Sequence, residues 1–294
     1  MRKDRLGVFL VLVSAIAFGL MPVFARLAYS YAVGVDELLF IRFGFAFLIV
    51  GGILAASRRF VLPKREDLLI LIGLGALGYF VQSTLYFTSV IYAPVAIVAL
   101  ILYTYPVFVT VGAFALGWEK ISGRLAAALI IALVGLILVA NPFGNPVGLG
   151  AMLALGASVT YTLYILCGSR VLRRVDGVLA AFFVMGAASF SFGVDGALSG
   201  SIRVEWSFGA WFWVAVITIL CTVIAVTAFF LGLSKIGPSK SSLISLIEPV
   251  TSILASTWLF GNALTVSQWL GGLLILAATA IIALYGKVEA LAPS

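Results

Sequence analysis

Glu248 is the residue whose type and position point most directly to chemistry. It lies at the middle of an apolar stretch of 23 residues, Pro238–Phe260. A carboxylate at the depth of a bilayer centre is costly and by default marks a functional site. It could take up and release a proton, or it could bind the ammonium group of a ligand. Alternatively its role is structural: hydrogen bonds to neighbouring hydroxyls would stabilise a helix break at Pro249.

A second set of polar and aromatic residues lies on one face of an expected helix. Four residues follow the spacing i, i+3, i+4, i+7, which places them on one side of a helix: Tyr79, Gln82, Ser83 and Tyr86. Their rings, hydroxyls and amide could bind an amphipathic molecule by stacking and a few directed hydrogen bonds. The alternative is a hydrogen-bonded seam between helices, with Tyr86 as an aromatic anchor at the membrane interface.

Other aromatic and hydroxyl residues inside apolar segments are further candidates to line a cavity, although such side chains are often only packed. Tyr103 and Tyr105 point in different directions on a continuous helix, so we expect at most one of them to face a central cavity. Arg42 lies about eight residues into its segment and can snorkel outwards, which favours a structural role. The remaining candidates are Thr160, Tyr161, Tyr164, Thr222 and Ser245.

Three prolines inside apolar segments are candidate hinges for moving helices. Proline lacks an N–H donor and tends to kink the helix that contains it. Because proline is also commoner in membrane helices in general, ordinary packing is the alternative. The three candidates are Pro22, Pro106 and Pro249.

The composition places these residues in a membrane protein. Of 294 residues, 63% are hydrophobic and 10% charged, whereas soluble domains are about 45–50% apolar and about 25% charged. A helix needs roughly 20 apolar residues to cross the hydrocarbon core, and barrel strands would be about half that length with alternating polarity. Ten helical spans are therefore expected: Leu6–Tyr29, Val35–Ser57, Leu68–Val90, Ala93–Leu116, Arg124–Ala140, Val147–Val171, Val178–Leu198, Gly209–Leu233, Pro238–Phe260 and Gln268–Gly286.

The basic residues indicate how these spans are oriented. Of the 18 Lys and Arg residues, 15 lie at the two termini or on alternate connections between spans. By the positive-inside rule that side is cytoplasmic, and the even number of spans agrees. Leu6–Tyr29 exceeds the roughly 7–15 residues of a signal-peptide core, so we expect it to be retained. We expect a multi-pass inner-membrane protein with both termini in the cytoplasm and no nucleic-acid partner.

The last five segments repeat the first five at an offset of about 144 residues. Ser14 matches Ser158, and Arg26 matches Arg170. Because five is odd, the second copy enters the bilayer from the opposite side, as is typical of alternating-access carriers. We expect an all-α integral membrane fold with two inverted five-helix repeats, in residues 1–143 and 144–294, and a substrate site near the mid-plane between them.

Short motifs spread over the chain carry a family resemblance. They are Ile41-Arg42-Phe43, Ala93-Pro94, Tyr105-Pro106, residues 116–122 (LGWEKIS), Gly237-Pro238, Glu248-Pro249 and Leu259-Phe260-Gly261. The chain resembles the drug/metabolite transporter superfamily in its ten-helix EamA-type branch, and within that branch the YddG-like amino-acid exporters. The resemblance implies that the first, third, fourth, sixth, eighth and ninth helices surround the cavity, with the fifth and tenth peripheral. Asn262 departs from the pattern, since it stands where the repeat would place a counterpart of Glu119.

Residue types that are missing exclude several functions. The chain has no histidine, which excludes histidine proton relays and HExxH zinc chemistry, and it has no GxSxG or Walker-type motif. We expect no enzymatic activity, no metal and no cofactor. We also expect no Lys or Arg at mid-depth, which disfavours phosphorylated dianions and favours a zwitterion, a cation or a neutral amphiphile.

The leading prediction is an alternating-access exporter of small amphipathic metabolites, above all amino acids with aromatic or bulky side chains. One rival is an exporter of drugs or cationic metabolites with Glu248 as the cation site. The other is a non-transporting membrane scaffold or complex subunit. The expected partners are a small-molecule substrate and the lipid bilayer. A homodimer is a further option, because small residues could support helix packing at Gly123, Ala127, Gly271 and Gly272.

Overall fold

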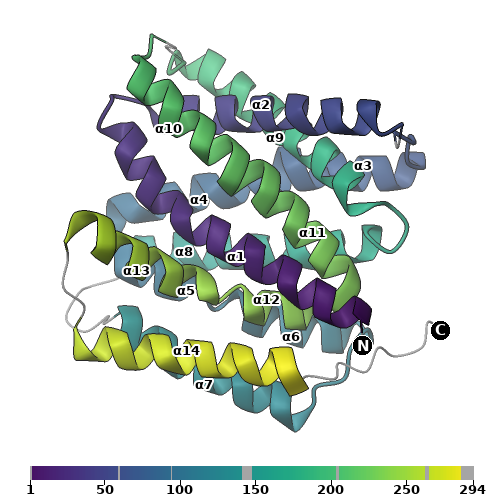
Figure 1. Cartoon of the computed structure of the whole chain (residues 1–294), viewed down its shortest axis with the longest axis vertical. Helices are drawn as coiled ribbons and strands as arrows, with labels where there is room; N and C mark the ends of the chain where they lie inside the picture. Colours follow the sequence, from purple (N-terminus) through teal and green to yellow (C-terminus); the bar gives the residue numbers. More distant parts are fainter. Residues whose placement is uncertain are drawn as a thin grey trace.

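The computed structural model describes residues 2–58, 60–93, 95–140, 148–202, 205–261 and 265–285. These residues form a bundle of long helices (Figure 1). In the described part, nine helical segments are long and apolar enough to cross a membrane, and Gly123–Leu138 forms a shorter apolar helix. The all-helical membrane fold expected from the sequence is confirmed.

Each half of the chain supplies five spans. The first half has α1 (Arg2–Tyr29), α2 (Val35–Ala56), a continuous run of α3 (Arg65–Gly73), η1 (Leu74–Tyr79) and α4 (Phe80–Tyr92), the pair α5 (Val95–Leu102) and α6 (Tyr105–Ala115), and α7 (Gly123–Ala140). The second half has α8 (Gly148–Val171), α9 (Gly177–Ser199), a run of α10 (Phe208–Thr218), η2 (Ile219–Ile224) and α11 (Ala225–Ile236), the pair α12 (Pro238–Ile244) and α13 (Ile247–Phe260), and α14 (Val266–Tyr285).

The two halves depart from regular α-helix at equivalent places. The third span of each half contains a short π-helix, η1 or η2, and the fourth span of each half is interrupted. Short π-helical stretches inside α-helices are frequent at functional sites. The internal repeat is therefore visible in the backbone irregularities as well as in the sequence.

Proline explains where the fourth spans break. The chain leaves the helix at residues 103–104 and again at 245–246. Pro249 has no N–H to donate to the Ser245 carbonyl, and its ring crowds that oxygen. The Ser245 oxygen instead accepts the Glu248 N–H at 2.9 Å, and Pro106 follows the first break in the same way. The breaks thus precede the prolines, and the expected continuous spans Ala93–Leu116 and Pro238–Phe260 are each a pair of short helices.

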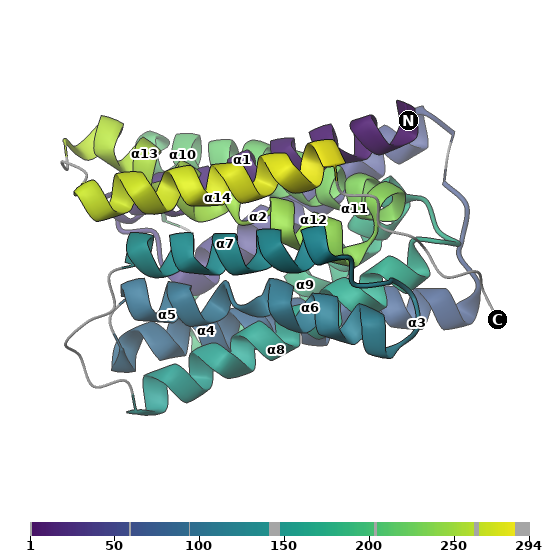
Figure 2. The same ribbon diagram turned by 90° about the horizontal axis from the view of Figure 1, so that it is seen from below.

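The halves pack against each other in a symmetric pattern. α2 packs on α9 and α7 on α14, which are equivalent spans of the two halves, while α1 packs on α11 and α13 just as α8 packs on α4 and α6. Figures 1 and 2 show α7 and α14 side by side at one margin of the bundle, in agreement with a peripheral position for the fifth and tenth spans. A Cβ on Gly135 would lie 2.7 Å from the Gly271 carbonyl oxygen, so these glycines allow close packing within the chain.

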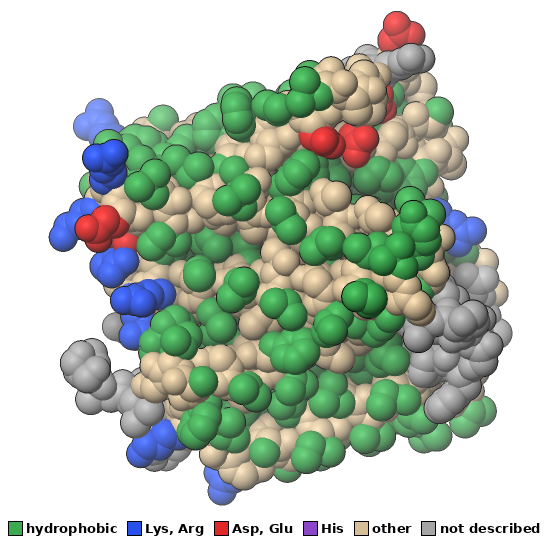
Figure 3. Space-filling view, turned by 180° about the vertical axis from the view of Figure 1, so that it is seen from behind, with side chains coloured by type: hydrophobic (Ala, Val, Ile, Leu, Met, Phe, Trp, Pro, Cys, Tyr) green, Lys and Arg blue, Asp and Glu red, His purple; other side chains and the backbone are tan. Residues whose placement is uncertain are grey.

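The outer surface has the polarity expected of a protein in lipid. Large apolar side chains such as Leu48, Phe190 and Leu273 are more than half exposed on it. Figure 3 shows apolar side chains over the middle of one face, with Lys and Arg gathered mainly at one end. We call this the basic end and the opposite one the distal end. α1 begins and α14 finishes at the basic end (Figure 2).

Candidate functional site

A cavity of about 450 Å³ lies inside the bundle, between the two halves. Helices α1, α2, α4, α5 and α6 from the first half and α8, α11 and α13 from the second contribute side chains to its wall. These are the six spans expected from the family resemblance, together with the second span. The wall combines aromatic rings with a few polar groups.

The cavity opens towards the distal end. Its described lining includes Tyr29, the last residue of α1, and Leu38 in the first turn of α2. On the other side it stops at Tyr164 of α8 and Phe229 of α11, about two turns before those helices end. Pro22 also lines it, but α1 continues through this proline without interruption.

Nine of the twelve residues expected from the sequence to bind the substrate line this cavity. They come from both halves of the chain and from helices that are far apart in sequence. They are Tyr79, Gln82, Ser83, Tyr86, Tyr103, Tyr105, Tyr161, Tyr164 and Glu248.

Three other candidates are not among the residues that line it. The Thr160 hydroxyl donates to Gly156 O at 2.8 Å, and the Thr222 hydroxyl donates to Ile217 O at 3.3 Å. Both therefore bond to their own helices. Ser245 is fully buried in the break ahead of α13.

Tyr103 and Tyr105 both line the cavity, and the expectation that only one could do so is wrong. It assumed a continuous helix, in which residues two apart point in different directions. The break at residues 103–104 redirects the chain between the two side chains, and their ring centroids lie 6.4 Å apart.

Tyrosine rings form a continuous aromatic wall. Tyr105 and Tyr161 meet edge to face at 4.6 Å, and Tyr161 stacks on Tyr164 at 5.9 Å. Tyr79 meets Tyr164 edge to face at 5.9 Å. Tyrosine offers an apolar ring together with a polar hydroxyl. The wall can therefore receive an apolar or aromatic group and still offer hydrogen bonds.

Glu248 stands at the start of α13, immediately after the break. Its carboxylate lines the cavity, and Oε2 accepts the Tyr103 hydroxyl at 3.4 Å. The first turn of a helix carries the positive end of the helix dipole, which favours an anion there. Helix α1 comes very close, since a Cβ on Gly19 would lie 2.6 Å from the Glu248 carbonyl oxygen. The break therefore directs a carboxylate into the space between the halves.

Arg42 also lines the cavity, and the expectation that it snorkels outwards is wrong. The residue is only 3% exposed. Its guanidinium donates to the Met21 sulfur and lies over the Phe43 ring, 4.5 Å from the ring centroid. The expectation that no Lys or Arg lies at the site is therefore also wrong. The signal that could have found it is its position: an arginine inside an apolar span is a functional candidate by default.

Polar contacts join the two halves at the basic end, beyond the floor of the cavity. Glu119, in the loop between α6 and α7, accepts the Ser239 N–H of α12 at 3.3 Å. Lys240 of the same helix pairs with Asp4 of α1 at 3.1 Å. A Cβ on Gly237, whose φ is +79°, would clash with a Glu119 carboxylate oxygen. We call these five residues the basic-end latch.

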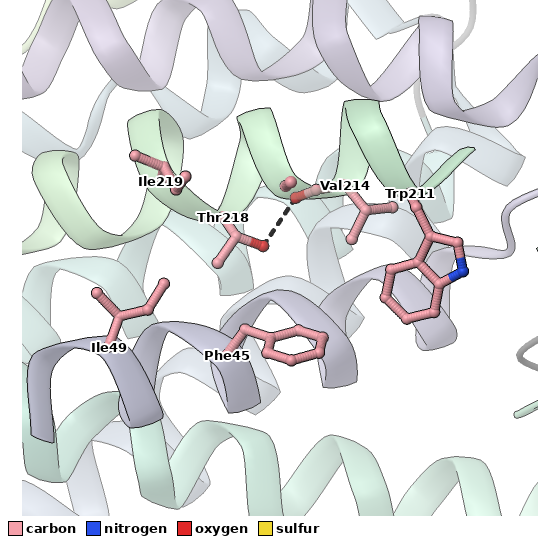
Figure 4. Close-up of a pocket in the computed structure, with 7 residues that line it drawn as sticks. Phe45, Ile49, Trp211, Val214, Thr218 and Ile219 are labelled. Atoms are coloured by element: carbon pink, nitrogen blue, oxygen red, sulfur yellow. Dashed lines mark hydrogen bonds between the residues drawn. The ribbon is translucent and has the colours of Figure 1, made fainter. Parts of the chain in front are cut away.

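A smaller groove of about 200 Å³ lies between α2 and α10 (Figure 4). Phe45, Ile49 and Trp211 contribute to its walls, and the hydroxyl of Thr218 donates to its own helix at Val214 O, 2.7 Å away. The Thr218 hydroxyl is thus bonded within its own helix, and the mainly apolar lining suits hydrocarbon.

The EamA-like transporter family matches this chain twice, over residues 5–141 and 148–284. The chain therefore belongs to that family. An uncharacterized transporter of Archaeoglobus fulgidus is 26% identical over 282 residues, which cover 95% of this chain and 97% of that protein. The uncharacterized inner membrane transporter YicL of Salmonella typhimurium is 26% identical over 307 residues, which cover 99% of each. A solved crystal structure shares the fold, with a TM-score of 0.82 and 19% identity over 95% of this chain and 98% of the other.

Membership of this family defines the class of protein. The chain is a multi-pass membrane transporter with two EamA domains, and it is not an enzyme. Its substrate has to be inferred from the cavity.

Proposed function

We propose that this transporter works by alternating access and exports small amphipathic metabolites, above all amino acids with aromatic or bulky side chains. The observation that carries the proposal is the cavity of about 450 Å³, whose wall combines tyrosines with the carboxylate of Glu248. Pockets of roughly 300–1,000 Å³ with apolar walls and a few polar groups are typical small-molecule sites.

The proposed mechanism moves one half of the bundle against the other around this cavity. We take residues 1–143 and 144–294 as the two moving repeats, with the breaks ahead of Pro106 and Pro249 as hinges. Discontinuous helices at the substrate site are common in carriers with inverted repeats.

The proposed orientation puts the basic end and both termini in the cytoplasm, because positively charged connections stay on that side. The cavity then faces the outside, and the basic-end latch closes the cytoplasmic side. An exporter in this conformation has just released its substrate. Reaching the inward-facing conformation would require the latch to open.

Glu248 has two proposed roles, and both depend on its carboxylate. A carboxylate at the wall can bind a substrate ammonium group directly. It can also carry a proton between the two conformations. The rival substrate class, cationic drugs or metabolites, draws on the same carboxylate, but the positive charge of Arg42 on the same wall disfavours a ligand that is only cationic.

Transport by purified protein in liposomes tests the proposal. We expect saturable flux of labelled phenylalanine, tryptophan or leucine above that of protein-free liposomes, and weaker flux of an aromatic amine without a carboxylate. Flux of the amine alone would favour the cationic-metabolite exporter. No flux of any amino acid or amine would contradict a carrier of small amphiphiles and favour a scaffold or complex subunit.

A further inference from the structure

We propose that Arg42 binds a carboxylate group of the substrate, so that the transporter selects amphiphiles that carry a carboxylate. This inference rests on the proposed transport function, since a solute meets Arg42 only inside the cavity. The sequence alone favoured a zwitterion, a cation or a neutral amphiphile. The proposal now requires that the substrate carry a carboxylate group.

The burial of Arg42 is the first observation. The side chain is 3% exposed, and its Nε has no hydrogen-bond partner. Its described contacts are the sulfur of Met21, the ring of Phe43 and the phenol of Tyr79. None of these groups is a carboxylate. A buried charge normally has an opposite charge as its partner, because removing it from water without one is costly.

The other titratable groups around Arg42 do not supply that negative charge. Among them are the phenols of Tyr29 and Tyr79 and the thiol of Cys221, groups that ordinarily stay neutral at pH 7. Glu248 is the carboxylate in the described lining, but its hydrogen bond goes to Tyr103. In the described part of the chain, the positive charge of Arg42 therefore has no ion-pair partner.

The chemistry of the guanidinium selects the ligand. Its planar array of N–H donors matches the two oxygens of a carboxylate, with which it can form two parallel hydrogen bonds. A phosphate ester could also meet these donors. It would bring a second negative charge into a cavity whose wall already holds the carboxylate of Glu248. The single arginine therefore favours a monoanionic group.

The remaining wall completes the description of the substrate. Tyr79 lines the cavity together with Arg42 and Glu248. With the substrate carboxylate bound to Arg42, the tyrosine rings can contact an apolar or aromatic side chain. Glu248 can then bind a positively charged group. An aromatic α-amino acid has all three features. A cationic drug without a carboxylate would leave Arg42 unpaired.

Three matched probes test this inference on the purified full-length protein. L-phenylalanine has both charges, 3-phenylpropanoate keeps only the carboxylate, and L-phenylalaninamide lacks it. Binding is measured as the rise in thermal unfolding midpoint across a titration of each probe. The variants are Arg42→Gln, Arg42→Lys and, as the control, Arg26→Gln at the exposed end of α1, which is outside the cavity lining.

We expect phenylalanine and 3-phenylpropanoate to stabilise the wild type and Arg26→Gln, and the amide to have little effect. Arg42→Gln should weaken phenylalanine binding by about tenfold or more, the usual scale for a hydrogen bond to a charged group. Arg42→Lys keeps the positive charge and should retain part of the phenylalanine binding. The test can therefore be read from Arg42→Lys even if Arg42→Gln does not fold. Equal binding of phenylalanine and its amide by the wild type contradicts the carboxylate site and leaves the carrier intact. Wild type that binds none of the probes contradicts both the site and the aromatic substrate class.

Discussion

Glu248 and Arg42 place one charge of each sign on a wall that is otherwise uncharged and mainly aromatic and apolar. Charges interact more strongly in such a low-dielectric space than in water. In the proposed transporter, these two residues therefore contribute most to solute selectivity, and the tyrosines supply shape and ring surface.

Glu248→Gln removes the carboxylate charge and keeps the side-chain shape. If Glu248 binds the substrate ammonium, uptake driven by a pH gradient and exchange of labelled for unlabelled substrate should both fall by about tenfold or more. If Glu248 carries the coupled proton, only the gradient-driven uptake should fall. Both assays use the same proteoliposomes, with Glu66→Gln in the exposed first turn of α3 as control. Wild-type rates in both assays would remove Glu248 from the mechanism.

Glu119 gives the basic-end latch a pH dependence. Burial raises the pKa of its carboxyl above the ordinary value, while bonds from Ser239 and the charge of Arg173 oppose the rise. The folded state then holds the proton more tightly than the unfolded chain, so wild-type stability falls as pH rises from the ordinary to the raised pKa. Gln cannot ionise. The unfolding midpoint of Glu119→Gln minus that of the wild type should therefore increase with pH. A difference that shrinks as pH rises would contradict this account.

The residue types of the site were largely predictable, because tyrosines, an amide and a carboxylate inside apolar spans stand out. Thr160 and Thr222 were expected to line the cavity, but the structure shows each hydroxyl bonded to a carbonyl of its own helix. A threonine hydroxyl can make such a bond in any helix, so the sequence alone does not reveal it. Arg42 was assigned wrongly for another reason. Whether it snorkels or faces the interior depends on which side of α2 meets α1, and that is decided by tertiary packing.

At the scale of elements, the interrupted fourth spans are the features that shape the site. The first break brings Tyr103 and Tyr105 to one cavity, and the second puts Glu248 at a helix start. Both are followed by proline at the beginning of the next helix.

Restoring the missing N–H should straighten these spans. Pro106→Ala and Pro249→Ala remove the clash and donor loss that interrupt a helix, an effect of about 3 kcal/mol or more in helix interiors. We expect the unfolding midpoint to stay level or rise while the transport rate falls. Pro63→Ala, between α2 and α3, is the matched control. Unchanged transport in both variants would show that the breaks are not needed for movement.

The spans themselves were predictable because crossing the hydrocarbon core imposes a minimum length on every helix. The sequence marked Pro22, Pro106 and Pro249 as candidate kinks, but not which of them follows a break, because proline in a membrane helix is tolerated and its effect on the backbone depends on neighbouring helices. The π-helical stretches were not predicted. The π-helices η1 and η2 recur in the third spans of the structure, and no sequence pattern indicated them.

At the scale of the whole molecule, the described lining of the cavity reaches the distal end and stops about two turns before the basic ends of α8 and α11. In a variant with Cys167 and Cys221 replaced by Ala, a membrane-impermeant maleimide added outside cells should therefore react with Tyr86→Cys on the cavity wall. It should spare Ala113→Cys, which is fully buried in α6. Excess substrate should slow the first reaction. A reversed labelling pattern would contradict the proposed orientation.

In the proposed mechanism, one cavity between two inverted repeats is exposed alternately to the two sides of the membrane. Counterflow tests it most directly. Proteoliposomes loaded with excess unlabelled phenylalanine are diluted into a trace of the labelled compound. Alternating access predicts a transient accumulation of label above its equilibrium level. The carrier brings label in, and the excess unlabelled phenylalanine inside occupies the site on most return steps, so little label is carried out again. Entry of label that rises only to equilibrium, at a rate independent of the unlabelled substrate inside, would contradict the account.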